Sequence, residues 1–383
     1  MDGSQADLAV IGGGQLARMM QPAAIGLGIR LRLLAEAPDV SAAQVIPDHV
    51  LGDHGNLDDL RRVAEGCAVV TFDHEHVPPE HLRTLEAEGH LPRPGPDALI
   101  YAQDKALMRS RLSELGFPVP AHRIIEGPQD LDDFADTVGG YPVVVKTTRG
   151  GYDGKGVWVV DAADDADEAF ASGQTLMAEE LVFFARELSA QVARRPSGSI
   201  VSYPVVESRQ AEGICKEVVA PAPELATGLK VEARALARSI AEALDVTGML
   251  AVELFETMDG RVLVNELAMR PHNTGHWTIE GAATSQFENH LRAVLDLPLG
   301  PTDARAPWSV MVNVLGGAVE DLESQLPAVL DAVPEAHVHL YGKAVKTGRK
   351  LGHVTVLGDD LARTIVRARR AADLLEKGRG PDE

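Results

Sequence analysis

A glycine-rich segment between two apolar runs constrains this chain more than any other feature. It spans residues 146–156 with the sequence KTTRGGYDGKG, and apolar runs at 143–145 and 157–160 flank it. Glycine lets backbone N–H groups approach an anion closely, and lysine supplies neutralising charge. No helix pattern follows, and the glycine spacing differs from that of a strand–loop–helix phosphate loop. We therefore predict a flexible hairpin loop against phosphates, although a glycine-rich surface hairpin would show the same pattern.

Two carboxylates on a predicted hairpin form the second half of the signal. Residues 250–267 alternate like two strands around an Asp-Gly turn at 259–260. Glu253 and Glu266 are therefore expected on neighbouring antiparallel strands and on one face. With Asn265 they offer the hard oxygen ligands that suit Mg²⁺ bridging the phosphates of ATP. Solvated glutamates on an exposed hairpin are the alternative, which the strongly apolar flanks disfavour.

Composition narrows the possible partners. The 383 residues suffice for two or three domains, and 57 acidic against 36 basic side chains give a net charge of −21. Such a surface repels nucleic acid and anionic membranes, so an anionic substrate needs a local basic cluster. The chain has only two cysteines, Cys67 and Cys215, which are too few for a disulfide framework. The N-terminus lacks a signal peptide pattern and no apolar run is long enough to span a membrane, which predicts a soluble cytoplasmic protein.

The order of predicted elements divides the chain. Strands and helices alternate over 1–98, which predicts a doubly wound parallel sheet that ends in a proline-rich linker. Residues 99–300 form a central domain, in which 121–185 make a smaller lobe that holds the glycine loop. A small β-rich domain is expected over 301–375, followed by a disordered tail at 376–383. The fold class is thus a combination of α/β and α+β.

The N-terminal glycines support a competing interpretation. Gly12, Gly14 and Ala17 follow a strand with the spacing of a dinucleotide fingerprint, and Glu36 ends the next strand at a suitable distance for a ribose. Alone this motif favours an NAD-dependent oxidoreductase, or simply a tight strand-to-helix turn. A dehydrogenase explains residues 143–266 poorly, so we rank it lower.

A polar run at 71–78 follows the third predicted strand of the first sheet. The carboxyl ends of such strands bind ligands in doubly wound folds. His74, His76 and His81 match no standard zinc spacing. Glu75 is therefore better explained as a polar substrate contact than as part of a metal site.

Three further segments carry groups that suit a nucleotide or a small anion. In the first, a hinge strand can expose backbone groups to an adenine edge, and a carboxylate beyond it can accept hydrogen bonds from ribose hydroxyls. In the second, Arg, His and Asn in one loop can bind a planar anion. Four cations near the C-terminus suit a phosphate. The alternatives are a solvated acidic strand, a helix N-cap and a basic surface turn. The segments are 178–187, 270–273 and 340–353.

Together these motifs resemble the ATP-grasp superfamily, and within it the N5-carboxyaminoimidazole ribonucleotide synthetase family of de novo purine biosynthesis. The resemblance covers nearly the whole chain, and the strings at 150–156 and 270–273 are its specific parts. It implies an ATP-grasp fold with an N-terminal doubly wound parallel sheet domain and a small C-terminal β-rich domain. It also implies a homodimer. The chain departs from the family in two places. Gln210 lies where many relatives have histidine, and Asp73-His74 departs from the first motif, which more often has Tyr-Glu-Phe-Glu.

The resemblance also implies a role for each site residue. ATP contacts fall to Lys105, Lys146, Gly151, Tyr152, Asp153, Gly154, Lys155, Gly156, Val157, Glu179, Glu180, Leu181, Val182, Glu187, Gln210, Asn265 and Glu266. Mg²⁺ falls to Glu253 and Glu266. Substrate contacts fall to Gln15, Leu16, Glu75, Tyr152, Asp153, Arg270, His272, Asn273, Lys343, Arg349 and Lys350. The residues expected to act on reacting groups are Asp153, Lys155 and Arg270.

The carbon of bicarbonate is a poor electrophile. The implied reaction therefore starts with an oxygen of bicarbonate attacking the γ-phosphorus of ATP. The resulting carboxyphosphate hydrolyses quickly in water, so the glycine loop is expected to close over it. Its carboxyl carbon then passes, as CO₂, to the exocyclic amine of aminoimidazole ribonucleotide, and Asp153 is expected to orient or deprotonate that amine. Alternatives are another ATP-grasp ligase, such as formate-dependent glycinamide ribonucleotide transformylase or biotin carboxylase, an NAD oxidoreductase, or a non-catalytic nucleotide-binding protein.

Overall fold

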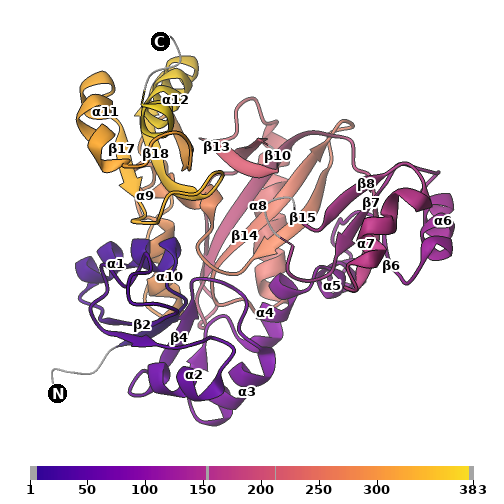
Figure 1. Cartoon of the computed structure of the whole chain (residues 1–383), viewed down its shortest axis with the longest axis horizontal. Helices are drawn as coiled ribbons and strands as arrows, with labels where there is room; N and C mark the ends of the chain where they lie inside the picture. The colour runs from indigo at the N-terminus through magenta and orange to yellow at the C-terminus, as the bar shows by residue number, and fades with distance from the viewer. Residues whose placement is uncertain (1–6, 152–154, 212, 379–383) are drawn as a thin grey trace.

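The computed structural model describes residues 7–151, 155–211 and 213–378, and their strands form three sheets (Figure 1). The first is parallel. Alternate residues of its central strand pack into two different cores, one against helix α1 and one against α2, so both faces are covered. The predicted doubly wound sheet is confirmed. In spatial order its strands are β3 (His49–Leu51), β2 (Leu31–Ala35), β1 (Leu8–Ile11), β4 (Val69–Phe72) and β5 (Leu91–Pro92), with helices α1 (Gln15–Leu27), α2 (Leu57–Ala64) and α3 (Pro79–Ala87).

The topology of this sheet creates a crevice. The chain moves outward from β1 through β2 to β3, and then returns to place β4 on the other side of β1. The connections after β1 and β4 therefore leave in different directions, and their carboxyl ends bound an open space where ligands bind in such folds. Helix α4 (Pro96–Gln103) follows, and the predicted boundary between residues 98 and 99 falls inside it.

A four-stranded antiparallel sheet forms the lobe that carries the glycine loop. Its hairpin pairs Lys146 with Val157 at the base of the loop. The spatial order is β6 (His122–Ile125), β9 (Leu176–Glu180), β7 (Val143–Thr147) and β8 (Val157–Val160), flanked by η1 (Ala163–Ala166) and helices α6 (Pro128–Thr137) and α7 (Asp167–Ala171). Helix α5 (Lys105–Glu114) leads into this lobe, and the Asp104 side chain caps it by accepting from the backbone N–H groups of Ala106 and Leu107.

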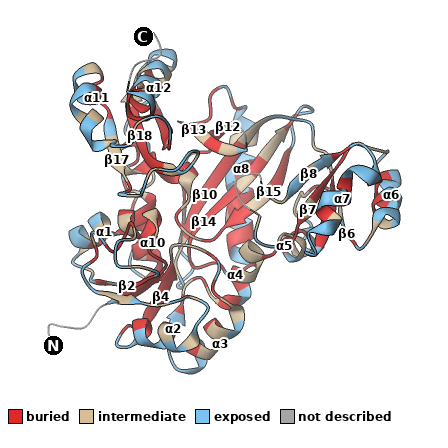
Figure 2. Ribbon diagram, in the orientation of Figure 1, coloured by how far each residue is buried: buried red, intermediate tan, exposed pale blue. Residues whose placement is uncertain are grey.

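The central sheet has nine strands, and buried residues concentrate along two of them, β10 and β14 (Figure 2). The predicted carboxylate hairpin is confirmed as β14 and β15. The path runs β15 (Val262–Ala268), β14 (Gly248–Thr257), β10 (Phe184–Arg194), β12 (Val206–Ala211), β13 (Ile214–Ala220), β16 (Trp308–Leu315), β18 (Lys350–Gly358) and β17 (His337–Leu340), with β11 (Ile200–Ser202) beside β10. Its helices and turns are α8 (Thr227–Ala243), η2 (Asn273–Gly275), α9 (Thr278–Gly281), α10 (Gln286–Val294), η3 (Glu323–Gln325) and α11 (Leu326–Ala332).

The C-terminal β-rich region is present, but its strands continue the central sheet because β16 pairs with the edge of β13. Helix α12 (Leu361–Lys377), which the sequence analysis did not predict, packs on β16 and β18. The predicted disordered tail is wrong for its first two residues. Glu376 is buried in α12, where it accepts from the Leu315 backbone N–H at 2.6 Å and from the Lys216 ammonium. Residues 379–383 lie outside the described residues.

One core cluster runs from the first sheet through α4 and α5 to β10, β14 and β15. The N-terminal and central parts are therefore packed together rather than linked loosely. Among the described residues, no helix combines the length and apolarity needed to cross a membrane.

Candidate active site

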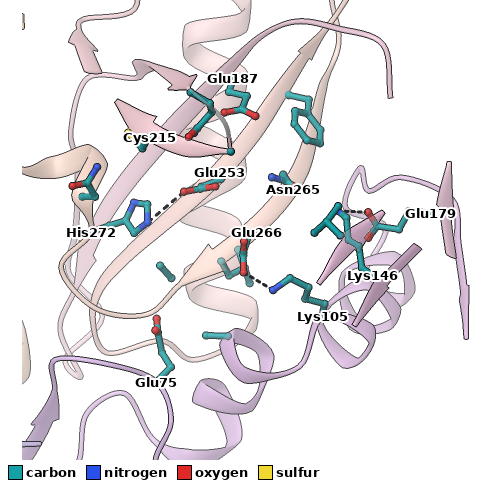
Figure 3. A pocket seen from close by; sticks show the side chains of 18 of the residues that line it. Glu75, Lys105, Lys146, Glu179, Glu187, Cys215, Glu253, Asn265, Glu266 and His272 are labelled. Carbon is teal, nitrogen blue, oxygen red and sulfur yellow. Dashed lines mark hydrogen bonds and ion pairs between the residues drawn. The ribbon is translucent and has the colours of Figure 1, made fainter. Parts of the chain in front are cut away.

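A cavity of about 750 Å³ lies where the crevice of the first sheet, the glycine-loop lobe and one face of the central sheet meet (Figure 3). Residues from all three sheets line it, although they are far apart in sequence. The predicted site residues among its lining are Gln15, Leu16, Glu75, Lys105, Lys146, Val157, Glu179, Glu180, Leu181, Val182, Glu187, Gln210, Glu253, Asn265, Glu266, Arg270, His272, Asn273 and Lys350.

The two predicted metal ligands face each other across β14 and β15. Glu253 is the direct register partner of Glu266. The Lys105 ammonium donates to Glu266 Oε1 at 2.9 Å, and His272 Nε2 lies 3.3 Å from Glu253 Oε1. Burial, followed by the nearby charges of Glu266 and Glu187, raises the pKa of Glu253 to about 8. Without a cation, these two close carboxylates cannot both ionise. Together they form a donor set that fits a divalent cation.

A bulge in this hairpin explains a third oxygen ligand. The register passes from Glu253–Glu266 to Leu254–Val264 and skips Asn265. Neighbouring residues in a regular strand point to opposite faces, but a bulge re-aims one of them. Asn265 and Glu266 therefore both line the cavity.

The predicted phosphate lysines approach from the lobe side. Lys105 lies in the first turn of α5, and Lys146 lies at the end of β7. The Glu179 carboxylate is shared between Lys146 Nζ at 2.5 Å and Arg109 Nε at 2.6 Å. Both carboxylate oxygens of Glu179 are therefore engaged within the protein, and the next three residues, Glu180, Leu181 and Val182, line the cavity.

The glycine loop is only partly described. Thr147 N donates to the carbonyl of Gly156 at 3.0 Å, and Lys105 Nζ donates to that of Gly151 at 3.3 Å. The loop therefore contacts the lysine that holds Glu266. Tyr152, Asp153 and Gly154 lie outside the described residues, and Lys155 is exposed beside them.

Glu187 and Gln210 meet at the ribose end predicted for the cavity. Burial raises the pKa of Glu187, and a hydrogen bond from Gln210 opposes that rise. The amide at 210 therefore contacts the carboxylate predicted to bind the ribose. Phe184 and Phe255 also line this end and stack with ring centroids 4.7 Å apart. Neither ring was predicted, although Phe255 lies two residues from Glu253 on one strand and hence on the same face.

The opposite end of the cavity opens into the crevice of the first sheet. Glu75 follows β4 and accepts from Arg270 Nε at 2.7 Å and from the Met269 backbone N–H at 3.0 Å. The ammonium of Lys343 donates to Gln15 Oε1, and burial lowers the pKa of Lys343 to about 8. Lys343 and Arg349 are not among the residues that line the cavity. Arg349 is exposed and donates to the Ala344 carbonyl at 3.2 Å.

The N-terminal glycine turn binds one of the protein's own carboxylates. Asp73 accepts from Gly14 N at 3.1 Å and from Ala17 N at 2.7 Å, so it occupies the start of α1 where a dinucleotide pyrophosphate would lie. Glu36 accepts from Gly13 N at 3.3 Å. The residues of the fingerprint are thus used internally, which removes the basis for the NAD interpretation.

Glu36, His54 and His74 bring one ligand atom each within 4.8 Å of one another. However, His74 Nδ1 accepts from the His76 backbone N–H at 3.2 Å. The second nitrogen of a metal-bound histidine normally donates its proton, so this geometry does not favour a metal there.

Family models match three consecutive regions of the chain. A ribonucleotide synthetase preATP-grasp domain matches 6–103, an ATP-grasp domain matches 110–287, and a phosphoribosylaminoimidazole carboxylase C-terminal domain matches 309–367. The order agrees with the predicted architecture.

Curated and solved relatives extend over nearly the full length. N5-carboxyaminoimidazole ribonucleotide synthase of Mycobacterium tuberculosis is 53% identical, covering 98% of this chain and 89% of the relative. The Thermus thermophilus synthetase structure is 40% identical with a TM-score of 0.86, covering 97% and 98% of the two chains. The Aspergillus clavatus enzyme, solved with ADP and 5-aminoimidazole ribonucleotide, is 34% identical with a TM-score of 0.89, covering 97% and 99%. The chain therefore belongs to the N5-carboxyaminoimidazole ribonucleotide synthase family of ATP-grasp ligases.

Proposed function

We propose that the protein carboxylates 5-aminoimidazole ribonucleotide with ATP and bicarbonate, releasing ADP and phosphate, in purine biosynthesis. The observation that carries this proposal is a single cavity joining the Glu253–Glu266 pair to the crevice beside Gln15 and Glu75. A phosphoryl donor at one end and an amine at the other can then share one short-lived intermediate. The family relationship supports the same reaction.

At the ATP end, Lys105 and Lys146 are placed to neutralise phosphate oxygens, and Glu253, Glu266 and Asn265 would hold Mg²⁺. When bound, the ion would supply positive charge that offsets the charge of the phosphates. Lys105 bridges Glu266 to the glycine loop, so the phosphate ligands and the loop over them are connected.

Between the two ends, Arg270 and His272 are placed to hold bicarbonate and then carboxyphosphate. Burial, followed by the charges of Arg270 and Lys350, holds the pKa of His272 well below its usual range, so this imidazole is neutral and offers one N–H donor and one acceptor nitrogen. Arg270 keeps its charge and presents a planar fork that matches a carboxylate. The pair suits a small planar anion.

The proposed reaction begins with phosphoryl transfer from ATP to bicarbonate. A bicarbonate oxygen forms a bond to the γ-phosphorus while the bond to the ADP oxygen breaks. Carboxyphosphate then releases CO₂ and phosphate, and the exocyclic amine forms a new N–C bond to CO₂ and loses one proton. We assign that proton to Asp153, and we assign water exclusion to the glycine loop.

The decisive experiment measures ADP release while each co-substrate is omitted in turn. We expect full turnover only with ATP, bicarbonate and aminoimidazole ribonucleotide together, and we expect the Asp153→Asn variant to lose carboxylation. Formate replacing bicarbonate would identify the alternative ligase instead. Undiminished carboxylation by Asp153→Asn would refute the role of that residue.

We also propose that the enzyme is a homodimer, which is the state the family resemblance implies, and that it is cytoplasmic. The net charge of −21 suits a protein that avoids nucleic acid and anionic membranes. Sedimentation equilibrium would test the dimer, and cell fractionation would test the compartment.

A further inference from the structure

A buried triad of charges lies behind the phosphate end of the cavity. Arg109 Nε donates to one oxygen of Glu179 at 2.6 Å, and Lys146 Nζ donates to the other at 2.5 Å. The side chains of Arg109 and Glu179 are 1% and 3% exposed, while that of Lys146 is 12% exposed. Because water screens buried charges poorly, the three charges interact strongly with one another.

Only part of the triad faces the ligand space. Lys146 and Glu179 line the cavity and Arg109 does not. Burial opposes the ionisation of Glu179, but Arg109 and Lys146 outweigh it and hold the pKa of Glu179 at about 2. Burial lowers the pKa of Lys146, and the charge of Glu179 opposes that fall. When all three side chains are ionised, the triad carries a net charge of one positive unit.

Arg109 has a second anchor on the metal hairpin. Its Nη1 donates to the Val264 carbonyl at 3.0 Å, next to Asn265 and Glu266 on β15. It also lies one helical turn after Lys105 on α5. One buried side chain thus connects the strand that carries Glu179 with the strand that carries Glu266.

We propose that Arg109 is a positioning residue for ATP, which neutralises Glu179 so that the charge of Lys146 stays available to a phosphate. Without Arg109, Glu179 and Lys146 cancel each other and the phosphate end loses one positive charge. The same guanidinium holds Lys146 in a fixed relation to Glu266. This inference rests on the proposed role of Lys146 as a phosphate ligand.

The charge count makes the test sharp, because it predicts that a second substitution repairs the first. Binding of ATP with Mg²⁺ and of adenosine, which has no phosphates, is measured by calorimetry on the full chain. We expect Arg109→Met to weaken ATP binding by roughly 10- to 100-fold, the range for a lost charge-assisted contact, and to change adenosine binding little. Adding Glu179→Gln to Arg109→Met restores the positive charge, and most of the ATP affinity should return.

Matched controls separate charge from folding. Arg111→Met removes an exposed arginine of the same helix, which pairs with Glu114, and should leave both affinities unchanged. If Arg109→Met alone does not fold, Arg109→Lys still tests the idea, because it keeps the positive charge beside Glu179 and should retain most of the ATP affinity.

Three results would overturn the inference. They are equal weakening of ATP and adenosine binding in Arg109→Met, no recovery of ATP binding in the double variant, and a loss of ATP affinity in Arg109→Lys as large as that in Arg109→Met. The assay contains neither bicarbonate nor ribonucleotide, so it does not depend on the carboxylation itself. Wild-type protein that failed to bind ATP would instead refute the proposed function.

Discussion

Replacing Glu253 by glutamine should stabilise the metal-free protein while it impairs catalysis. At pH 7 the folded chain keeps a proton on Glu253, because its pKa there is about 8, whereas the unfolded chain, with the usual value of 4.5, does not. Each pH unit between 4.5 and 7 costs about 1.4 kcal/mol of folding free energy, which sets an upper limit of about 3 kcal/mol.

The expected gain is smaller than that limit. The Glu253 side chain is 27% exposed, so water screens part of the cost, and we expect Glu253→Gln to add about 1–2 kcal/mol. For a cooperative unit of ordinary domain size, this corresponds to a Tm increase of roughly 2–8 °C. The size of the gain depends on pH. A raised carboxyl pKa lowers the folding stability of the wild type as pH rises from about 4.5 toward 8, so the stability gained by Glu253→Gln should shrink at acidic pH.

Thermal unfolding in EDTA at pH 5.5 and pH 7.5, followed by circular dichroism, measures this effect. Glu242→Gln on the exposed face of α8 is the matched control and should leave Tm unchanged. Adding Mg²⁺ and ATP should raise the Tm of the wild type more than that of Glu253→Gln. A variant no more stable than the wild type at pH 7.5, or equally stabilised at both pH values, would refute the reasoning.

Three further predictions concern substrate binding. Lys343 loses its charge near pH 8, so the KM for aminoimidazole ribonucleotide should rise above that pH in the wild type and stay level in Lys343→Arg; a pH series of initial rates decides this. Phe255→Ala removes a ring that lines the cavity, and it should raise the KM for ATP roughly tenfold with the ribonucleotide KM unchanged, as steady-state kinetics would show. Asp73→Ala removes the carboxylate that holds Gly14 and Ala17 on either side of the predicted substrate contacts Gln15 and Leu16, and it should raise the ribonucleotide KM roughly tenfold, whereas an equal rise in the ATP KM would contradict a local effect.

Local patterns allowed much of the fold and family to be predicted. Apolar runs with period two, an Asp-Gly turn and the 146–156 loop identified the hairpins, and β14 and β15 pair Glu253 with Glu266 as expected. The family assignment is confirmed over nearly the full length. The role of each site residue stays a prediction until the variants are measured.

Other features depend on contacts that sequence spacing does not encode. The bulge at Asn265, the Asp73 carboxylate at the start of α1 and the stacking of Phe184 on Phe255 each require two strands or loops to meet in one register. Residues 361–375 lie within the region predicted to be β-rich, yet they form most of α12, which buries its apolar side on β16 and β18.

The sequence by itself determined which chemical groups the protein contains and which strands carry them. This is because the hydrophobic period and the turn residues specify strands and turns over only a few positions. Only the tertiary structure decided which charges cancel. Arg109, Glu179 and Lys146 are 70 positions apart at most along the chain, yet they share one buried carboxylate. Electrostatic energy depends on distance and burial rather than on sequence order, so the state of these groups emerges only when the three sheets close around one cavity.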